Sequence, residues 1–176
     1  MTQLLETLPL APEELVIFGK SVRTPRLVSF HGDPGARYGY SGKVFEPRPW
    51  VDALSALRAR LADALGATFH CVLVNHYRDG TDAMGWHADD EPELGPDAPH
   101  DVLIASVSLG APRRFVLRHR RRATEKHALE LGEGSLLVMG GATQHRFQHA
   151  VPRTARPVGP RTNLTFRIIR ALSPPR

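Results

Sequence analysis

Short strand-like segments, separated by turns that contain glycine or proline, fill most of the second half of the sequence. The segments expected to form strands are 68–78, 101–109, 114–119, 127–131, 134–139, 144–150 and 162–170. Turn signals lie between them, among them Asp79-Gly80, Gly110-Ala111-Pro112 and Gly140-Gly141. Many short strands with frequent turns favour a β-sandwich or a jelly roll.

One clear helix precedes these segments and is predicted over residues 49–65. Pro49 suits its first turn, apolar residues recur at helical spacing, and Gly66 suits its end. Residues 1–13 are expected to form a loose lead-in and residues 14–46 short strands and turns. We therefore expect one domain over residues 1–176, mainly β (α+β), with an N-terminal helix that supports the sheets.

Composition narrows the class of protein. A formal net charge of +5 and a pI of about 10.0 favour an anionic partner, and nucleic acid is favoured over a membrane surface.

Cys71 is the sole cysteine, so it cannot form an internal disulfide and is expected to be a small buried hydrophobic residue. The N-terminus lacks the pattern of a signal peptide, and no segment has the length of a membrane span. We expect a cytoplasmic monomer with no membrane partner.

A metal site is predicted at Trp86-His87-Ala88-Asp89-Asp90. In extended backbone, His87 and Asp89 point the same way because they are two residues apart. A distant strand would supply a second histidine, either His149 or His145, which are four residues apart. Two histidines and one carboxylate form the facial triad of non-haem iron(II) oxygenases, although a zinc hydrolase could use the same ligands.

A carboxylate-binding site is predicted on the strand RTNLTFR (161–167). Arg161 and Arg167 share one face of this strand with Asn163 and Thr165, while Leu164 and Phe166 share the other. Arginine suits forked recognition of a carboxylate. With Asn75 and Tyr77 on the strand before the metal ligands, these residues could hold a dicarboxylate such as 2-oxoglutarate.

Taken in chain order, these motifs resemble the AlkB family of alkylation-repair dioxygenases. NHYRDGTDAMGWHADDE (75–91) is similar to the N-x-Y strand and ligand turn of the family branch that contains nuclear enzymes for double-stranded DNA. VLIASVSLGAPRRFVLR (102–118) and GSLLVMGGATQHRFQHAVP (134–152) resemble the strands that follow, and RTNLTFR closes the pattern. TPRLVSFHGDPGARYGYSG (24–42) extends the likeness, which covers about residues 14–170.

The resemblance implies a fold, cofactors and an activity. The fold would be a double-stranded β-helix, with a nucleotide-recognition region at 1–46 and a catalytic core at 67–170. Fe(II) and 2-oxoglutarate would be the cofactors, with dioxygen and alkylated DNA as partners. The reaction would be oxidative demethylation of N-alkylated bases of the 1-methyladenine or 3-methylcytosine type, which releases formaldehyde and succinate.

The resemblance also assigns roles to numbered residues. Iron would be bound by His87, Asp89 and His149, which is preferred to His145 because it begins the H-A-V-P step of the family's distal ligand. Asp90 and Glu91 would complete the catalytic set by reading or polarising the edge of the base. The 2-oxoglutarate contacts would come from Asn75, Tyr77, Arg161, Thr165 and Arg167.

DNA contacts are predicted in three places. Ile17-Phe18-Gly19-Lys20 resembles an apolar finger that fills the gap left by a flipped base. The stretch 113–126 has seven basic residues against one acidic residue and is expected to grip phosphates. The contacts would come from Phe18, Gly19, Tyr38, Tyr40, Ser41, Arg118, Arg120, Arg121 and Arg153. The loop after Arg118 is shorter than in the nuclear enzymes, which weakens the prediction of a double-strand preference.

Three other functions stay open on sequence grounds. A related dioxygenase could act on RNA or protein, and the basic stretch does not separate DNA from RNA. A non-catalytic nucleic-acid binding module would leave the H-x-D pair and the distal histidine unexplained. A zinc hydrolase would have no use for the Arg161 and Arg167 pair.

Overall fold

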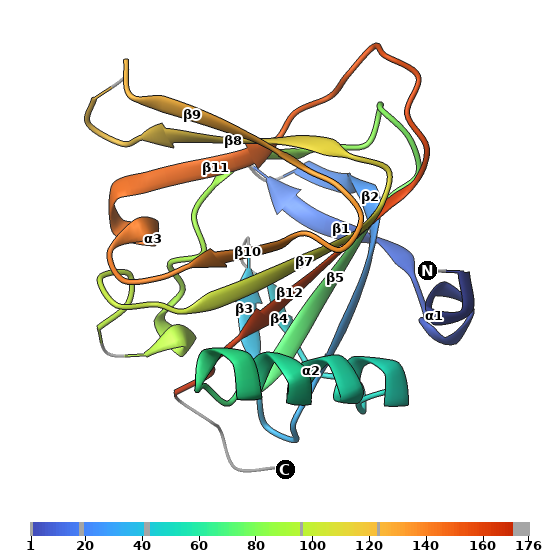
Figure 1. The fold of residues 1–176 in the computed structure, drawn as a ribbon, viewed down its shortest axis with the longest axis vertical. Helices are drawn as coiled ribbons and strands as arrows, with labels where there is room; N and C mark the ends of the chain where they lie inside the picture. The colour runs from blue at the N-terminus through green and yellow to red at the C-terminus, as the bar shows by residue number, and fades with distance from the viewer. Residues whose placement is uncertain (1, 18–19, 41–42, 96, 123, 171–176) are drawn as a thin grey trace.

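Two antiparallel β-sheets face each other in the computed structural model, which describes residues 2–17, 20–40, 43–95, 97–122 and 124–170 (Figure 1). The six-stranded sheet contains, in spatial order, β1 (Ala11–Ile17), β2 (Lys20–Gly32), β5 (Cys71–Tyr77), β12 (Arg161–Arg167), β7 (Ile104–Gly110) and β10 (Leu136–Met139). The four-stranded sheet contains β6 (Met84–His87), β11 (Phe147–Val151), β8 (Arg113–His119) and β9 (Lys126–Leu131). A small hairpin is formed by β3 (Tyr38–Tyr40) and β4 (Lys43–Phe45).

The strands from β5 to β12 form a jelly roll, because the chain passes repeatedly between the two sheets. The orders β5-β12-β7-β10 and β6-β11-β8-β9 place strands that are distant in sequence side by side. Strand β12 pairs with β5 on one side and with β7 on the other. The predicted jelly roll is therefore confirmed, and β1 and β2 extend its larger sheet.

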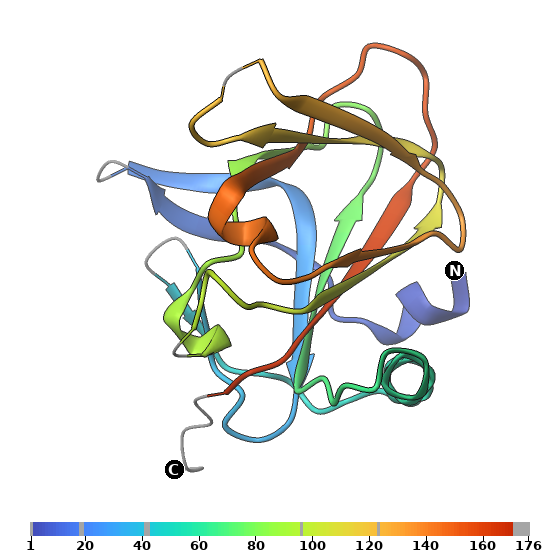
Figure 2. The same cartoon turned by 60° about the vertical axis from the view of Figure 1, so that its left-hand side comes forward.

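Helix α2 (Asp52–Leu65) supports the outer face of the six-stranded sheet (Figure 2). Its Leu54 and Leu61 are buried in a cluster with Val72 and Phe166 of the sheet. The helix ends at Gly66, whose left-handed backbone (φ 63°) suits glycine and whose N–H donates to Ala62 O at 2.8 Å. The other helices are α1 (Thr2–Thr7), the short 3-10 helix η1 (Pro92–Leu94) and α3 (Thr143–Arg146).

The two faces of β12 lie in different environments. Leu164 and Phe166 face the helix α2 layer, where Phe166 stacks on Trp50 with ring centroids 6.4 Å apart. The alternate residues of β12 are polar, and all seven residues of the strand are buried. A polar strand face inside a protein must find hydrogen-bond partners, so this face marks the interior of the jelly roll as a candidate site.

Several details differ from the sequence prediction. The helix begins at Asp52, so Pro49 precedes it, and four strands come before it in the chain. The lead-in predicted over residues 1–13 is wrong, because α1 and the start of β1 lie there. Strand β6 was not predicted, and residues 144–146 belong to α3 rather than to a strand. No helix within the described residues is long and apolar enough to cross a membrane.

Candidate metal and 2-oxoglutarate site

Two neighbouring strands of the smaller sheet bring together His87, Asp89 and His149. His87 ends β6, Asp89 follows two residues later, and His149 lies in β11 directly across from His87. One ligand atom from each side chain can be chosen so that all three lie within 4.8 Å of one another. Two imidazoles and one carboxylate on one side are a suitable donor set for Fe(II).

The orientation of His87 is fixed by its backbone neighbour. Nδ1–H of His87 donates to the carbonyl of Gly85 at 2.9 Å, which leaves Nε2 as the ligand atom, 3.7 Å from Asp89 Oδ1. Burial, followed by the charge of His87, lowers the pKa of His149 to about 4. The pKa of His87 is also lowered, mainly by burial. Both imidazoles are therefore neutral at physiological pH, as metal binding requires.

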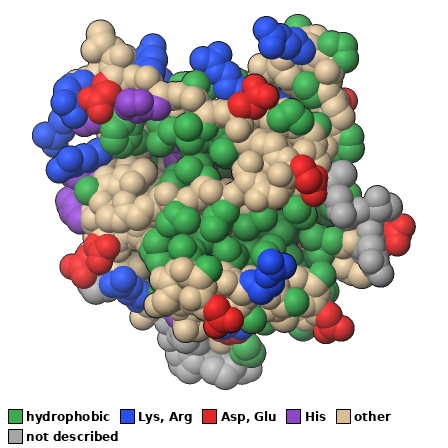
Figure 3. All heavy atoms as spheres, viewed as in Figure 1, with side chains coloured by type: hydrophobic (Ala, Val, Ile, Leu, Met, Phe, Trp, Pro, Cys, Tyr) green, Lys and Arg blue, Asp and Glu red, His purple; other side chains and the backbone are tan. Residues whose placement is uncertain are grey.

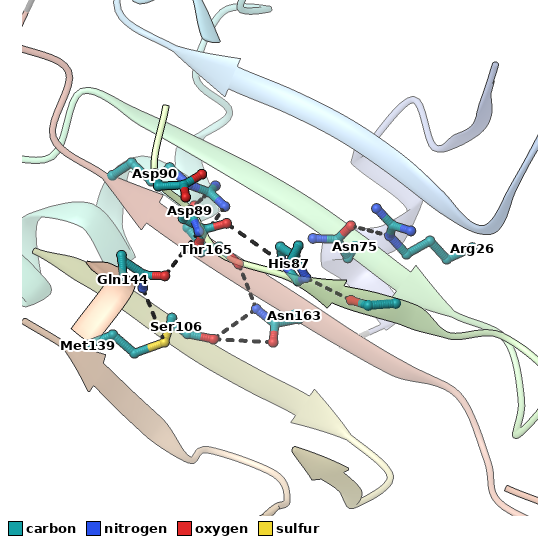
Figure 4. A network of polar contacts seen from close by, with 12 residues as sticks. Arg26, Asn75, His87, Asp89, Asp90, Ser106, Met139, Gln144, Asn163 and Thr165 are labelled. Carbon is teal, nitrogen blue, oxygen red and sulfur yellow. Dashed lines mark hydrogen bonds and ion pairs between the residues drawn. The ribbon is translucent and has the colours of Figure 1, made fainter. Parts of the chain in front are cut away.

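Asp89 is held through both its carboxylate and its backbone N–H. Oδ2 lies 3.1 Å from Nη2 of Arg167, and the backbone N–H of Asp89 donates to Gln144 Oε1 at 3.0 Å. Gln144 in turn donates through Nε2 to Met139 Sδ at 3.6 Å (Figure 4). Burial alone would raise the pKa of Asp89, but Arg167 and the two histidines bring it to about 2. The carboxylate is thus ionised and ready to bind a cation.

A cavity of about 40 Å³ opens beside this triad. The triad forms part of its wall, together with Tyr38, Asn75, Tyr77, Asn163, Thr165 and Arg167. Three of these residues come from the polar face of β12, so the cavity lies between the two sheets. Its polar lining suits a small polar molecule.

Arg161 is the most unusual group next to this cavity. Its side chain is completely buried, and Nη2 donates to Ser108 Oγ at 2.8 Å and to Asn163 Oδ1 at 2.7 Å. Nε and Nη1 are buried without a hydrogen-bond partner, and no carboxylate of the described residues pairs with this guanidinium. Its carbon Cζ lies 5.4 Å from the centre of the Tyr77 ring, which lines the cavity. A buried cation with two unused donors is costly unless an anion binds to it.

The family resemblance assigned no role to Asn163, Ser106 or Arg26, which hydrogen-bond within or beside the cavity. Asn163 donates through Nδ2 to Thr165 Oγ1 at 2.9 Å and to Ser106 Oγ at 3.0 Å (Figure 4). Arg26 donates through Nε to Asn75 Oδ1 at 2.6 Å. Asn163 could have been assigned from its place between two predicted ligands. Arg26 lies 49 residues from Asn75, and no local pattern links them.

The residues predicted to read the base lie around the same cavity. Tyr38 is fully buried, and its ring centre lies 4.7 Å from Cζ of Arg167. Burial and repulsion from Asp89 raise the pKa of Glu91 to about 8, although Arg167 and the Tyr38 side chain act in the opposite direction. Asp90, by contrast, lies at the surface in an ion pair with Arg120.

The other predicted DNA contacts fall into three groups. Phe18, Gly19 and Ser41 lie outside the described residues, as does the side chain of Tyr40. Arg118 is already engaged, because its guanidinium lies 4.3 Å from the Trp86 ring and donates to Gln148 Oε1 at 2.8 Å. The remaining three, Arg120, Arg121 and Arg153, are exposed.

His145, the alternative distal histidine, does not join the triad. It lies exposed on α3, where its ring centroid is 4.0 Å from that of His100.

Comparisons with known proteins agree with this geometry. The sequence profile of the 2OG-Fe(II) oxygenase superfamily matches residues 1–167. The DNA oxidative demethylase ALKBH2 of Mus musculus is 44% identical over 160 residues, which cover 87% of this chain and 65% of that protein. The alpha-ketoglutarate-dependent dioxygenase alkB homolog 3 of Mus musculus is 40% identical over 154 residues, which cover 82% and 52%. This chain therefore spans less than two thirds of the length of either relative.

A solved structure supports the fold. The structure of OsALKBH1 aligns with a TM-score of 0.60 at 17% identity and covers 90% of this chain and 81% of that chain. The matching superfamily implies Fe(II) and 2-oxoglutarate as cofactors, and the His87, Asp89 and His149 triad could bind the metal. The profile match across residues 1–167, together with the alkB relatives, shows that the chain belongs to the 2OG-Fe(II) oxygenase superfamily and, within it, to the AlkB family.

Proposed function

We propose that this chain is an Fe(II)- and 2-oxoglutarate-dependent dioxygenase that removes alkyl groups from the nitrogen atoms of DNA bases. The observation that carries the proposal is Arg161, a fully buried arginine with two unused N–H donors and no acidic partner among the described residues. Such a group calls for an anionic ligand. The DNA oxidative demethylase ALKBH2 of Mus musculus supplies the choice of substrate.

The iron would be held by His87 Nε2, His149 and one oxygen of Asp89. The hydrogen bond from His87 Nδ1 to Gly85 fixes the ring, and Arg167 occupies the second oxygen of Asp89. Three protein ligands leave further metal positions for a co-substrate and dioxygen. When bound, Fe(II) and 2-oxoglutarate would supply oxidation of the alkyl carbon by dioxygen, with decarboxylation of 2-oxoglutarate to succinate.

The 2-oxoglutarate would lie along the polar face of β12. Arg161 would bind the carboxylate farther from the metal, because its Nε and Nη1 have no hydrogen-bond partner among the described residues. Arg26 accounts for the orientation of Asn75, since it occupies the amide oxygen and leaves the NH₂ group as a donor. Tyr77 and Thr165 line the same cavity, and Arg167 would act near the metal through its ion pair with Asp89.

The alkylated base would approach from the side of Tyr38. Tyr38 also lines a smaller adjoining cavity of about 10 Å³, together with Glu13, Thr24 and Arg26. Residues 1–46 would thus form the nucleotide-recognition region and residues 67–170 the catalytic core. We assign Glu91 and Asp90 to contacts with the base or its strand, and Phe18 and Gly19 to the gap left by the flipped base.

The other candidate functions have less support. A zinc hydrolase could use the triad but gives no role to Arg161, and a non-catalytic binding module explains neither group. The family match and the named relatives also favour the dioxygenase.

We also propose that the protein is a monomer located in the cytoplasm. Light scattering would test the oligomeric state, and cell fractionation would test the location.

The decisive experiment measures formaldehyde and succinate release with Fe(II), 2-oxoglutarate and an oligonucleotide that contains 1-methyladenine. We expect the two products in equal amounts, from single- or double-stranded DNA, and none from the His87→Ala variant. Matched RNA and a methylated protein serve as alternative substrates. Turnover of RNA or protein without turnover of DNA would overturn the choice of substrate, and a lack of response to 2-oxoglutarate would overturn the reaction.

A further inference from the structure

Arg113 is a buried cation to which the proposed function gives no role. It begins β8 and is buried with Phe115, whereas Arg114 between them is exposed. Figure 3 shows Lys, Arg and His side chains gathered on the left of the molecule, over β8, β9 and α3. Arg113 belongs in sequence to the same basic stretch, but its side chain is only 3% exposed. A buried guanidinium is costly, so its position needs a reason other than contact with a ligand at the surface.

The guanidinium of Arg113 is held by main-chain carbonyls. Nη1 donates to Asp79 O at 2.9 Å, and Nη2 donates to Asp82 O at 2.9 Å and to Pro152 O at 2.8 Å. The carboxylate of Asp82 pairs with Arg78 instead. Because carbonyl groups are neutral, these hydrogen bonds satisfy N–H groups of Arg113 without pairing its positive charge with an anion.

The three carbonyls belong to two loops that connect the two halves of the site. Loop 78–83 joins β5 to β6, and loop 152–160 joins β11 to β12. Each loop therefore connects a strand with a predicted metal ligand to a strand with predicted 2-oxoglutarate contacts. The loops also contact each other, since the N–H of Thr154 donates to Gly80 O at 2.9 Å. Arg113 thus fixes both connections at once.

The ring of Tyr77 contacts two buried arginines. Its centre lies 5.6 Å from Cζ of Arg113 and 5.4 Å from Cζ of Arg161. Burial lowers the pKa of Arg161, Tyr77 opposes this effect, and the charge of Arg113 adds to it. Tyr77 lines the cavity beside the triad, so two like charges lie next to this part of the cavity. Like charges repel each other, and an anion bound here would relieve the repulsion.

We propose that Arg113 is a positioning residue for 2-oxoglutarate, which holds Tyr77 in place and adds its positive charge to that of Arg161. The inference rests on the proposed assignment of Arg161 to the carboxylate farther from the metal. Arg113 itself does not line the cavity, so it acts through Tyr77 and through its charge. It therefore favours a 2-oxo acid with a second carboxylate over a 2-oxo acid that has only one.

The test compares the binding of 2-oxoglutarate with that of 2-oxobutanoate, which lacks the second carboxylate. Calorimetry of the Mn(II)-loaded protein measures the first Kd directly and the second by competition. We expect Arg113→Met to weaken 2-oxoglutarate binding about tenfold, because a cation roughly 10 Å from an anion inside a protein contributes about that much. Binding of 2-oxobutanoate should change little. Arg113→Lys, which keeps the charge, should recover most of the loss.

Arg78→Gln is the matched control for a purely structural role. Arg78 holds the same loop, with Nη2 2.8 Å from Asp82 Oδ1, but its side chain is 57% exposed. The control loosens the loop and leaves the charge beside Tyr77 unchanged. If Arg78→Gln and Arg113→Met weaken both acids alike, or if Arg113→Met keeps the wild-type preference for 2-oxoglutarate, the positioning role is wrong.

Urea unfolding first establishes that each variant is folded. Arg113→Gln, which keeps an amide donor, replaces Arg113→Met if the latter does not fold, and the same loss of preference is expected of it. The choice of variant therefore does not change which result supports the inference.

Three outcomes separate this inference from the proposed function. If wild type demethylates DNA and the Arg113 variants keep its preference for 2-oxoglutarate, only the inference fails. If the Arg113 variants lose that preference but wild type demethylates no base, only the proposed substrate fails. If Arg161→Met keeps the preference of wild type, the assignment of the carboxylate to Arg161 fails, and the inference fails with it.

Discussion

Arg167 and Asp89 form a buried ion pair, with Nη2 3.1 Å from Oδ2 and each side chain only 3% exposed. Arg167 thereby occupies one oxygen of a predicted metal ligand and leaves the other for the metal. The pair joins the central strand β12 of one sheet to the ligand turn after β6 of the other. The integrity of the metal site is therefore coupled to the packing of the two sheets.

Replacing Arg167 should impair both stability and metal binding. Removal of one partner from a buried pair costs about 3–5 kcal/mol, and loss of a group that orients a ligand weakens metal affinity about 10- to 100-fold. We expect Arg167→Gln to show both effects and Arg167→Lys to recover part of each. Urea unfolding and Mn(II) titration would check this. Wild-type affinity in Arg167→Gln would contradict the positioning role.

Replacing Arg161 should abolish the stabilisation that 2-oxoglutarate gives to the protein. Arg161→Met removes two buried donors without hydrogen-bond partners, but it also removes the hydrogen bonds from Nη2 to Ser108 and Asn163. We expect these opposing effects on the cofactor-free protein, each about 1–3 kcal/mol, largely to offset each other. Wild type should gain about 2.7 kcal/mol when 2-oxoglutarate is present at 100 times its Kd, and the variant should gain none. Thermal unfolding with Mn(II), with and without 2-oxoglutarate, measures both. Arg60→Met is the control, and a variant that still responds would contradict the assignment.

Gln144 should be required for a rigid ligand turn. It is completely buried and accepts the N–H of Asp89 at 3.0 Å. Gln144→Leu leaves that N–H unsatisfied, which we expect to cost about 1–3 kcal/mol of unfolding free energy and to weaken metal binding. Thr143→Ala, a surface change on the same helix, should cost much less. Equal losses in the two variants would argue against a specific role for Gln144.

Asp82 should make stability depend on pH in the acid range. Its carboxylate accepts hydrogen bonds from Arg78 N, Nε and Nη2, at 2.8 to 2.9 Å. Burial raises the pKa of Asp82, but the Arg78 interactions outweigh it, so the net pKa is lowered. A lowered folded-state pKa contributes stability above the unfolded value of about 3.9, and this contribution disappears as pH falls through the folded pKa.

The Asp82→Asn variant tests that dependence. Urea midpoints of wild type should fall more steeply than those of the variant as pH decreases from about 5 to below 3, because only wild type has this carboxylate to protonate. The two proteins should differ most near neutral pH. Parallel curves for the two proteins would show that Asp82 does not contribute.

The strand RTNLTFR shows what the sequence could predict. Its alternation placed Leu164 and Phe166 on one face and the polar residues on the other, and the structure has this arrangement. Strand geometry is local, with a period of two residues, so the pattern is visible without the fold. The spacing of His87 and Asp89 could be interpreted for the same reason, because residues two apart in extended backbone point the same way.

Contacts between distant segments could not be predicted from the sequence. Gln144 lies 55 residues from Asp89, and nothing near either residue suggests their hydrogen bond. The short strand β6 has no clear alternation of apolar and polar residues. It is a strand because it pairs with β11, a contact between distant segments that its own sequence does not indicate. Arg118 was expected to contact DNA because it lies in a basic run, and that run gave no sign of its contact with Trp86.

The position of β12 between β5 and β7 also bears on how the protein is made. The ribosome synthesises β12 after both of its neighbours, yet β5 and β7 have no direct pairing with each other. Until residues 161–167 have emerged, the larger sheet stays divided, and its two halves expose unpaired edges. The nascent chain is then most exposed to aggregation, and a chaperone that shields strand edges would act in this interval.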